Sequence, residues 1–196
     1  MDQIDFNNIK IKLLTENNVI NQFDCGNTDL NEFLQKDAII QKNFMLNTSY
    51  LVYYDDKIVG FFTLSTDIIN LKKLSDSYKE KFEGKEIKYK TFPAIKLGRL
   101  AIDKEFQQKG IGELLIQWII NYSLSISKNI GFRFISIDAY ITAYKFYQKH
   151  YFQIVPKNLK QILEKFEKSK TRDKKAAEKM TIPMFLDLYK FKSLLS

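Results

Sequence analysis

The stretch KLGRLAIDKEFQQKGIGELLI, residues 96–116, decides the fold. Its apolar run Leu97–Ile102 is typical of a buried strand, and a short polar turn separates this run from Gly110 and Gly112. After the glycines, apolar residues recur at the spacing of one buried helix face. The members of that face are Ile111, Leu114, Leu115, Trp118, Ile119 and Tyr122. The stretch therefore predicts a strand, a glycine-containing loop and a helix in succession.

A junction of this kind favours a phosphate ligand. The first turn of a helix carries free backbone N–H groups and the positive end of the macrodipole, and glycines let a ligand approach the backbone closely. The dinucleotide fingerprint requires a third glycine where this chain has Leu115, and the nucleoside triphosphate loop requires Gly-Lys-Ser/Thr, which is absent. The pattern that remains is Gln107-x-x-Gly110-x-Gly112.

Composition places the chain among basic globular proteins. Its 196 residues, 45% of them hydrophobic, fit a single domain. The 31 basic and 23 acidic residues give a net charge of +8, which suits RNA, a phosphate-rich cofactor, or simply a solvated basic surface. The single cysteine, Cys25, excludes an internal disulfide and fits a reducing compartment. No apolar run of membrane length and no signal peptide is found, so we expect a cytoplasmic protein.

Local patterns predict the other elements. A first strand is expected over Ile9–Leu14, followed by a helix that Asn27 or Thr28 caps. Two β-branched and aromatic runs, Thr48–Tyr54 and Ile58–Ser65, predict a hairpin. The remaining expectations are a short helix and loop over 70–89, a strand from Thr91 to Ile102, a helix over 111–127, a strand over 131–139, a helix over 142–150, a basic helix within 157–179 and a last strand over 181–189.

The glycine loop resembles the Arg/Gln-x-x-Gly-x-Gly/Ala acetyl-coenzyme A loop of the GNAT acetyltransferase superfamily. Three further segments resemble the toxin branch of type II toxin–antitoxin systems, which acetylates aminoacyl-tRNA: Phe23–Leu34, Leu97–Asp103 and Ala143–Tyr147. The resemblance covers roughly residues 10 to 155. It implies an α/β GNAT fold, a twisted, mixed, mostly antiparallel sheet with helices on both faces and splayed central strands. Residues 1–196 would form one such domain, with a basic helical insertion at about 157–179.

The resemblance also implies where the co-substrate, acetyl-coenzyme A, binds. The pantetheine arm would pair with the backbone of the strand that ends near Ile102, and the pyrophosphate would lie on the loop and the first turn of the helix. The residues implied are Leu100, Ala101, Ile102, Gln107, Gln108, Lys109, Gly110, Ile111, Gly112 and Glu113. No metal site is expected, because one cysteine and one histidine do not form a ligand cluster.

Acetyl transfer needs a proton for the departing thiolate, and Tyr147 matches the family tyrosine that follows a phenylalanine. A phenol with a pKa near 10 is mostly protonated at neutral pH and can protonate a thiolate whose conjugate acid has a pKa of about 8.5. The alternative is that Tyr147 only packs in the core. Backbone N–H groups at the end of Leu100–Ile102 are the expected oxyanion donors. His150 is more typical of a structural residue, and nothing in the sequence near Cys25 favours a nucleophilic thiolate.

The lack of a clear general base favours an α-amine acceptor. An α-amine with a pKa of about 7.7–8.0 is substantially neutral at physiological pH, whereas a lysine amine near 10.4 needs a group that takes its proton. The resemblance implies that the acceptor is aminoacyl-tRNA, that acetylation blocks translation, and that a ribbon-helix-helix antitoxin and a homodimer are the expected partners. The alternatives are a GNAT enzyme for a protein or small-molecule amine, and a catalytically silent coenzyme A-binding or RNA-binding module.

Several basic residues are candidates for RNA contact. The resemblance links Arg99, Lys36 and Lys42 to the tRNA, although each also reads as an ordinary surface cation. Between Pro156 and Thr181, nine basic residues and four acidic residues leave +5 of the total charge of +8. This segment could follow an RNA backbone, be a solvated face, or be covered by an acidic antitoxin. The family glycine after the tyrosine helix is replaced by His150-Tyr151, so that turn must form without glycine.

Overall fold

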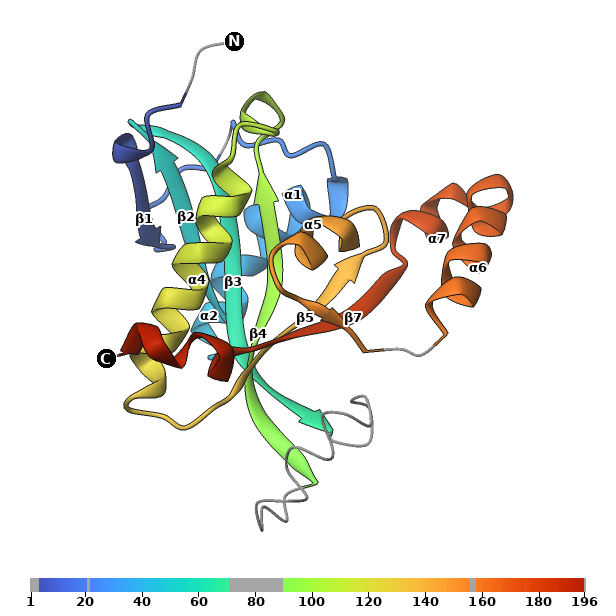
Figure 1. Ribbon diagram of the computed structural model, residues 1–196. Helices are drawn as coiled ribbons and strands as arrows, with labels where there is room; N and C mark the ends of the chain where they lie inside the picture. The colour runs from blue at the N-terminus through green and yellow to red at the C-terminus, as the bar shows by residue number, and fades with distance from the viewer. Residues whose placement is uncertain (1–3, 21, 71–89, 156–157, 196) are drawn as a thin grey trace. The chain divides into compact units, whose positions relative to one another are not determined.

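The computed structural model describes residues 4–20, 22–70, 90–155 and 158–195. Its strands form a seven-stranded sheet in the order β1-β2-β3-β4-β5-β7-β6 (Figure 1). The chain divides into two compact units, the first with residues 1–66 and 97–121 and the second with residues 67–96 and 122–196. Of the helix and loop predicted over 70–89, residues 71–89 lie outside the described residues, and Asn70 ends a strand.

The predicted hairpin is confirmed in the first unit. β2 (Thr48–Tyr54) pairs antiparallel with β3 (Lys57–Asn70), and β1 (Ile9–Leu13) pairs antiparallel with the other edge of β2. Asp55 takes a left-handed φ of 51° in the turn, a conformation that aspartate tolerates. β3 continues beyond the predicted end at Ser65, so sequence patterning located the hairpin but not the full length of its second strand.

Helices cover both faces of the sheet in the first unit. Phe61 and Phe62 are neighbours on β3, so their side chains point to opposite faces. Phe61 stacks on Phe33 with ring centroids 6.1 Å apart, whereas Phe62 contacts Trp118 of α4 at 5.5 Å. Figure 1 shows the same arrangement, with α4 on one side of the strands and α1 and α2 on the other.

The predicted N-terminal helix is present but is interrupted. Asn27 caps α1 (Thr28–Glu32), because its side chain accepts the N–H of Leu30. A π-helical turn, η2 (Phe33–Asp37), then leads into α2 (Ala38–Asn43). The apolar residues Leu30, Phe33, Leu34 and Ala38 are all buried. The wide π turn was not predicted, since the apolar spacing across it is compatible with an ordinary helix.

Helix α4 spans Ile111–Ser127, as predicted. Its buried face differs in part from the predicted one, because Leu114, Trp118 and Tyr122 are only half-buried. The fully buried side chains are Ile111, Leu115, Ile116, Ile119, Ile120, Ser123 and Leu124. The buried face is therefore rotated toward Ile116 and Ile120. Because α4 has apolar residues on most of its sides, their spacing alone does not identify which side is buried.

The second unit is built around β5 (Phe134–Tyr140). This strand pairs antiparallel with β7 (Thr181–Asp187) along its whole length, and the two-residue β6 (Gln153–Ile154) lies on the other edge of β7. β4 (Thr91–Ile102) pairs parallel with β5 over Ala94–Lys96. The sheet is therefore mixed and mostly antiparallel, since four of the five described ladders are antiparallel and one is parallel.

Aromatic residues form the core of the second unit. The ring of Phe134 meets those of Phe92 and Phe185 edge to face, with centroids 5.9 and 5.7 Å apart. Arg133 and Asp187 form two parallel hydrogen bonds of 2.9 Å at the edge of this core. The last strand ends at Asp187, two residues earlier than predicted, and continues as η5 (Leu188–Leu195).

The basic segment before β7 is helical. It contains α6 (Leu159–Arg172) and α7 (Lys174–Glu178), which lie side by side (Figure 1). The side chain of Asp173 accepts the N–H of Ala176 and so caps α7. Among the described helices, none has the length and apolar character needed to cross a membrane.

Candidate active site

The loop that follows β4 lies in the first unit and is tied to the strand end. Asp103 is 3% exposed and caps η4 (Lys104–Phe106), since its Oδ1 accepts the N–H of Glu105 at 3.0 Å. The amide Nε2 of Gln107 donates to the carbonyl oxygens of Ile102 and Cys25, both at 2.9 Å. In the structure the predicted cofactor residue Gln107 thus closes the loop, and its side-chain N–H groups are engaged with backbone.

The segment Phe23–Asn27 clamps this loop from the other side. The backbone of Asp24 donates to Oδ2 of Asp103 at 3.1 Å and accepts the N–H of Lys104 at 2.9 Å. Its carboxylate accepts Nζ of Lys104 at 2.7 Å, the N–H of Gly26 at 2.8 Å and the amide of Asn31 at 2.7 Å. These hydrogen bonds, that of Lys104 first, hold the pKa of Asp24 far below its usual range.

The clamp was not predicted, although its residues belong to a segment that the sequence singled out. Asp24 and Gly26 have the spacing of a carboxylate that accepts a backbone N–H two residues later, which is a local signal in the sequence. The contact with Asp103 and Lys104 joins positions about 80 residues apart and has no such signal.

The predicted anion loop has the backbone geometry that an anion site needs. Gly110 has φ +84° and Gln108 has φ +60°, so the chain makes a left-handed turn directly before α4. α4 begins at Ile111, and the N–H groups of its first turn have no partner within the helix. A Cβ on Gly110 would lie 3.0 Å from the ring of Phe6. Ile111, Gly112 and Glu113 therefore present backbone N–H groups at the positive end of a 17-residue helix.

The other predicted cofactor residues lie on the strand before the loop and on the loop itself. Ala101 is buried, and Leu100 and Ile102 are half-buried. Gly60 of β3 allows a close approach there, since a Cβ on it would lie 2.9 Å from the carbonyl oxygen of Ala101. The ammonium group of Lys109 lies 5.2 Å from the ring centre of Phe106 and places a positive charge on the loop.

The three predicted RNA-contacting cations have partners within the first unit. The guanidinium of Arg99 lies over the ring of Phe33, 3.7 Å from its centre. Nζ of Lys36 is 3.2 Å from Glu32 in an exposed pair one helical turn apart. Nζ of Lys42 donates to the carbonyl oxygen of Leu14 at 2.6 Å. Lys42 thus joins α2 to the end of the first strand, and Lys36 remains the most solvent-accessible of the three.

Tyr147 lies in the second unit on α5 (Tyr144–Lys149). It is 9% exposed, and its ring meets those of Phe146 and Phe152 edge to face at 5.1 and 5.6 Å. Burial raises the pKa of Tyr147 above its usual value near 10. The phenol therefore stays protonated at neutral pH, as a proton donor must. His150 is also buried, with its ring 4.7 Å from that of Phe146.

The turn after α5 forms without glycine, as the sequence requires. Tyr151 takes a left-handed φ of 71°, which is unusual for a bulky side chain. Its ring is exposed and meets Phe191 of η5 at 5.6 Å. The turn is therefore made with a tyrosine in the left-handed region.

Two other candidate chemistries receive no support from the side-chain geometry. Burial raises the pKa of the Cys25 thiol, and the thiol donates to Oδ1 of Asn31 at 3.1 Å. A thiolate nucleophile is disfavoured in such surroundings. In the described part of the chain, no three His, Cys, Asp or Glu side chains gather as a metal site would require.

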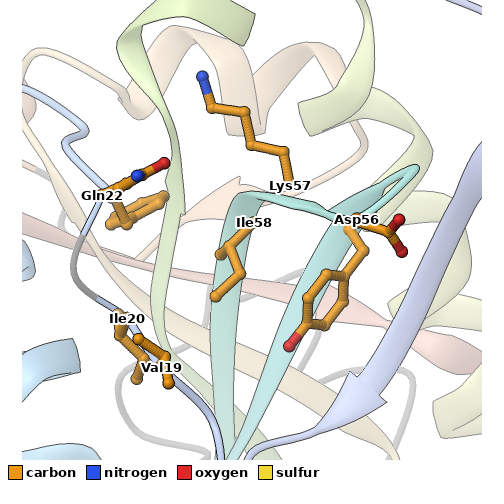
Figure 2. A pocket seen from close by; sticks show the side chains of 8 residues that line it. Val19, Ile20, Gln22, Asp56, Lys57 and Ile58 are labelled. Atoms are coloured by element: carbon orange, nitrogen blue, oxygen red, sulfur yellow. The ribbon is translucent and has the colours of Figure 1, made fainter.

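A pocket of about 510 Å³ lies beside the turn of the β2–β3 hairpin in the first unit (Figure 2). Figure 2 shows Val19 and Ile20 next to each other on the segment after β1, with Ile58 on the neighbouring strand. Lys57 at its rim pairs with Glu105 of η4 at 2.5 Å. The lining residues are Val19, Ile20, Gln22, Phe23, Tyr53, Asp56, Lys57 and Ile58. None of the predicted site residues lines this pocket.

A match to a family model shows the class of protein to which the chain belongs, a class of acyltransferases. Residues 46–154 match the model of the acetyltransferase (GNAT) domain, which is more than half of the chain. The chain belongs to the GNAT acetyltransferase family, and the predicted fold class and family are confirmed.

Toxins of the same fold are similar to this chain. The tRNA-acetylating toxin of Mycobacterium tuberculosis (strain ATCC 25618 / H37Rv) is 25% identical over 138 residues, 70% of this chain and 80% of that protein. The structure of AtaT complexed with acetyl-methionyl-tRNAfMet has a TM-score of 0.73 and 24% identity, covering 96% of this chain and 99% of that one. An AtaT mutant toxin bound to the C-terminus of the antitoxin AtaR and acetyl-CoA has a TM-score of 0.68 and 21% identity over 96% and 99%.

Proposed function

We propose that the chain transfers the acetyl group of acetyl-CoA to the α-amine of aminoacyl-tRNA and so acts as a translation-blocking toxin. The geometry that carries this proposal is the left-handed turn at Gly110, because it leads directly into the first turn of α4, whose N–H groups have no partner within the helix. Membership of the GNAT family supports acetyl-CoA as the donor. The relative named a tRNA-acetylating toxin supports aminoacyl-tRNA as the acceptor.

The first unit would supply the donor site. Ile111, Gly112 and Glu113 offer backbone N–H groups to the pyrophosphate, with Gln108, Lys109 and Gly110 forming the turn and Gln107 fixing its shape. The AtaT complex that contains acetyl-CoA supports this choice of ligand. The β4–β5 ladder covers only Ala94–Lys96 among the described residues, so β5 does not use the backbone groups of Leu100, Ala101 and Ile102. Those groups could pair with the pantetheine arm.

The second unit would supply the proton donor. The acceptor nitrogen attacks the thioester carbon, the C–S bond breaks, and the phenol of Tyr147 gives its proton to the departing thiolate. After attack the nitrogen carries a positive charge and loses a proton as the amide forms, and the tyrosinate recovers this proton directly or through solvent. An α-amine needs no dedicated base, because a pKa of about 7.7–8.0 leaves a substantial neutral fraction at physiological pH.

The finer assignments belong to the same proposal. We expect a single cytoplasmic GNAT domain that forms a homodimer and is neutralised by a ribbon-helix-helix antitoxin. The AtaT complex with its antitoxin AtaR supports a protein partner. Exposed apolar side chains at the end of α2, Ile40, Phe44, Met45 and Leu46, offer the surface that such a partner would cover. Arg99 and Lys36 remain candidates for RNA contact.

The distribution of labelled acetyl groups tests the proposal. The purified chain is incubated with labelled acetyl-CoA and an equal mixture of charged tRNA, deacylated tRNA and a lysine-containing peptide. We expect label on charged tRNA alone, in a form that mild base releases together with the amino acid. Label on the peptide would favour a protein-directed GNAT enzyme, and no transfer to any acceptor would favour a silent coenzyme A-binding or RNA-binding module.

A further inference from the structure

Helix α6 has one apolar face and, opposite to it, one face that is exposed to solvent. Its apolar face comprises Leu159, Ile162, Leu163 and Phe166, of which Phe166 is 6% exposed and the others are half-buried. The aliphatic stem of Lys170 folds onto this face, with Nζ 4.7 Å from the ring centre of Phe166. Packing of the apolar face holds the helix in place, and the face on the other side is left to solvent.

The exposed face has a net positive charge, although Glu164 also lies on it, one helical turn from both Lys160 and Lys168. We call Lys160, Lys165, Lys168 and Arg172 the basic face; all four are exposed. Within the described ranges none of the four has an acidic partner at ion-pair distance, whereas Lys170 pairs with Glu167 at 3.0 Å and Lys174 with Glu178 at 4.0 Å. Lys165, Lys168 and Arg172 follow one another at helical spacings of three and four residues, where like charges repel.

The dimensions of the basic face suit an extended polyanion. Twelve residues separate Lys160 from Arg172, which at 1.5 Å per residue is about 18 Å along the helix. A row of cations on this scale can neutralise several successive phosphates of one strand. Lysine and arginine contacts to phosphate need no apolar surface around them.

The composition of this surface disfavours a protein partner. Cores of protein interfaces are enriched in aromatic residues and depleted of lysine. Along α6 and α7 no large apolar side chain is exposed, whereas such side chains do gather elsewhere, at the end of α2. The two surfaces therefore differ in the partner that each fits.

We propose that the basic face of α6 binds the phosphate backbone of RNA and anchors the tRNA on the second unit. The proposal rests on the proposed function for the identity of the RNA, but not on the chemistry of the acetyl transfer. Two alternatives for this segment, that an acidic antitoxin covers it or that it is only a solvated surface, are outcomes of the test of this proposal.

The test compares two variants with equal loss of charge. One replaces Lys165, Lys168 and Arg172 by Gln, and the control replaces Lys10, Lys90 and Lys128, which are also exposed, by Gln. Glutamine has nearly the helix propensity of lysine and arginine, so α6 should remain folded, as circular dichroism would check. The dissociation constant for a deacylated tRNA is measured for both variants and the wild type between about 50 and 200 mM KCl.

We expect the α6 variant to bind tRNA on the order of 100-fold more weakly at 100 mM salt and to show a shallower salt dependence. The slope of log K against log salt should fall by about 2–3, because each lost phosphate contact contributes about 0.7–0.9. With charged tRNA, the KM should rise while kcat and the affinity for acetyl-CoA stay at the wild-type values. The control should keep the wild-type slope.

An unchanged slope and KM in the α6 variant would overturn the inference while leaving the proposed function intact, provided that the wild type acetylates charged tRNA. Binding of poly-glutamate by the wild-type face as tightly as tRNA would also overturn it, because an acidic protein would then be an equal ligand. A wild type that binds tRNA through α6 but acetylates no charged tRNA would support the inference and reject the proposed function.

Discussion

The proposed role of Tyr147 as proton donor can be tested directly by substitution. Replacing it with Phe keeps the ring contacts to Phe146 and Phe152 and removes the proton donor. We expect kcat for acetyl transfer to fall by about 10²–10⁴-fold, with acetyl-CoA affinity unchanged. Tyr144→Phe on the same helix is the matched control and should retain most activity. Full activity in the Tyr147 variant, measured by coenzyme A release, would assign Tyr147 to packing alone.

The pH dependence of kcat/KM distinguishes the ionisation of the acceptor amine from that of the proton donor. Activity should rise with an apparent pKa of about 8 as the α-amine loses its proton. Because burial raises the pKa of Tyr147, the phenol should stay protonated and no alkaline decline should appear below about pH 10. Initial rates with charged tRNA, measured in short assays because the aminoacyl ester hydrolyses, would show this profile. A decline beginning near pH 9 would identify another group as the acid.

Asp24 should contribute to stability in a pH-dependent way. Its pKa in the folded state lies below the ordinary value of 3.8, so its contribution is present above that value and is lost as pH falls toward the folded-state pKa. The difference in melting temperature between the wild type and Asp24→Asn should be larger at pH 7 than at pH 2. A double-mutant cycle with Lys104→Gln should show stronger coupling at pH 7 than at pH 2. A constant difference at both pH values would contradict the role of the carboxylate.

The helix that carries Tyr147 was predictable from local sequence, and Tyr147 is buried on it. The role of Tyr147 as proton donor stays a prediction. Gln107 stays a predicted cofactor residue, and the structure adds that its side chain joins Ile102 and Cys25. The contact with Cys25 connects distant segments, which single-sequence spacing does not encode.

At the scale of elements, the turn into α4 is the decisive feature. Gly110→Ala would impose a left-handed φ on an L-residue and place its Cβ 3.0 Å from Phe6. We expect a loss of about 1–2 kcal/mol of folding stability and a marked loss of acetyl-CoA affinity. Isothermal titration and denaturant unfolding would measure both effects.

Gly131→Ala is the control for this turn, because its Cβ would meet nothing within 4 Å and its backbone is not left-handed. It should leave acetyl-CoA affinity unchanged. Equal affinity losses in the two variants would show that the conformation of Gly110 is not what the ligand requires.

Element boundaries show what sequence patterning can and cannot supply. The β2–β3 hairpin and α4 follow from clear periodicity and turn residues, and both are confirmed. The π turn at Phe33–Asp37 escaped prediction because apolar spacing alone does not distinguish it. At Tyr151 the sequence predicted only that the turn forms without glycine, and the left-handed φ of 71° was not predicted.

At the scale of the whole molecule, charge and chemistry are divided between parts of the chain. The first unit holds the predicted anion loop and its clamp, and the second holds Tyr147 and the basic face of α6. Composition predicted a polyanionic partner from the net charge of +8 but could not locate the surface. Among the residues that the structure describes, it separates cations that are paired from those, such as the basic face of α6, that are exposed with no acidic partner at ion-pair distance.

The amine that receives the acetyl group tests the central claim most directly. The wild-type chain is incubated with acetyl-CoA and the full set of charged tRNAs, the esters are hydrolysed, and the released amino acids are identified by mass spectrometry. The account predicts one or a few amino acids acetylated at the α-nitrogen, and none in the reaction with Tyr147→Phe at matched times. Consumption of acetyl-CoA with every released amino acid unmodified, or modified only at a lysine ε-nitrogen, would contradict it.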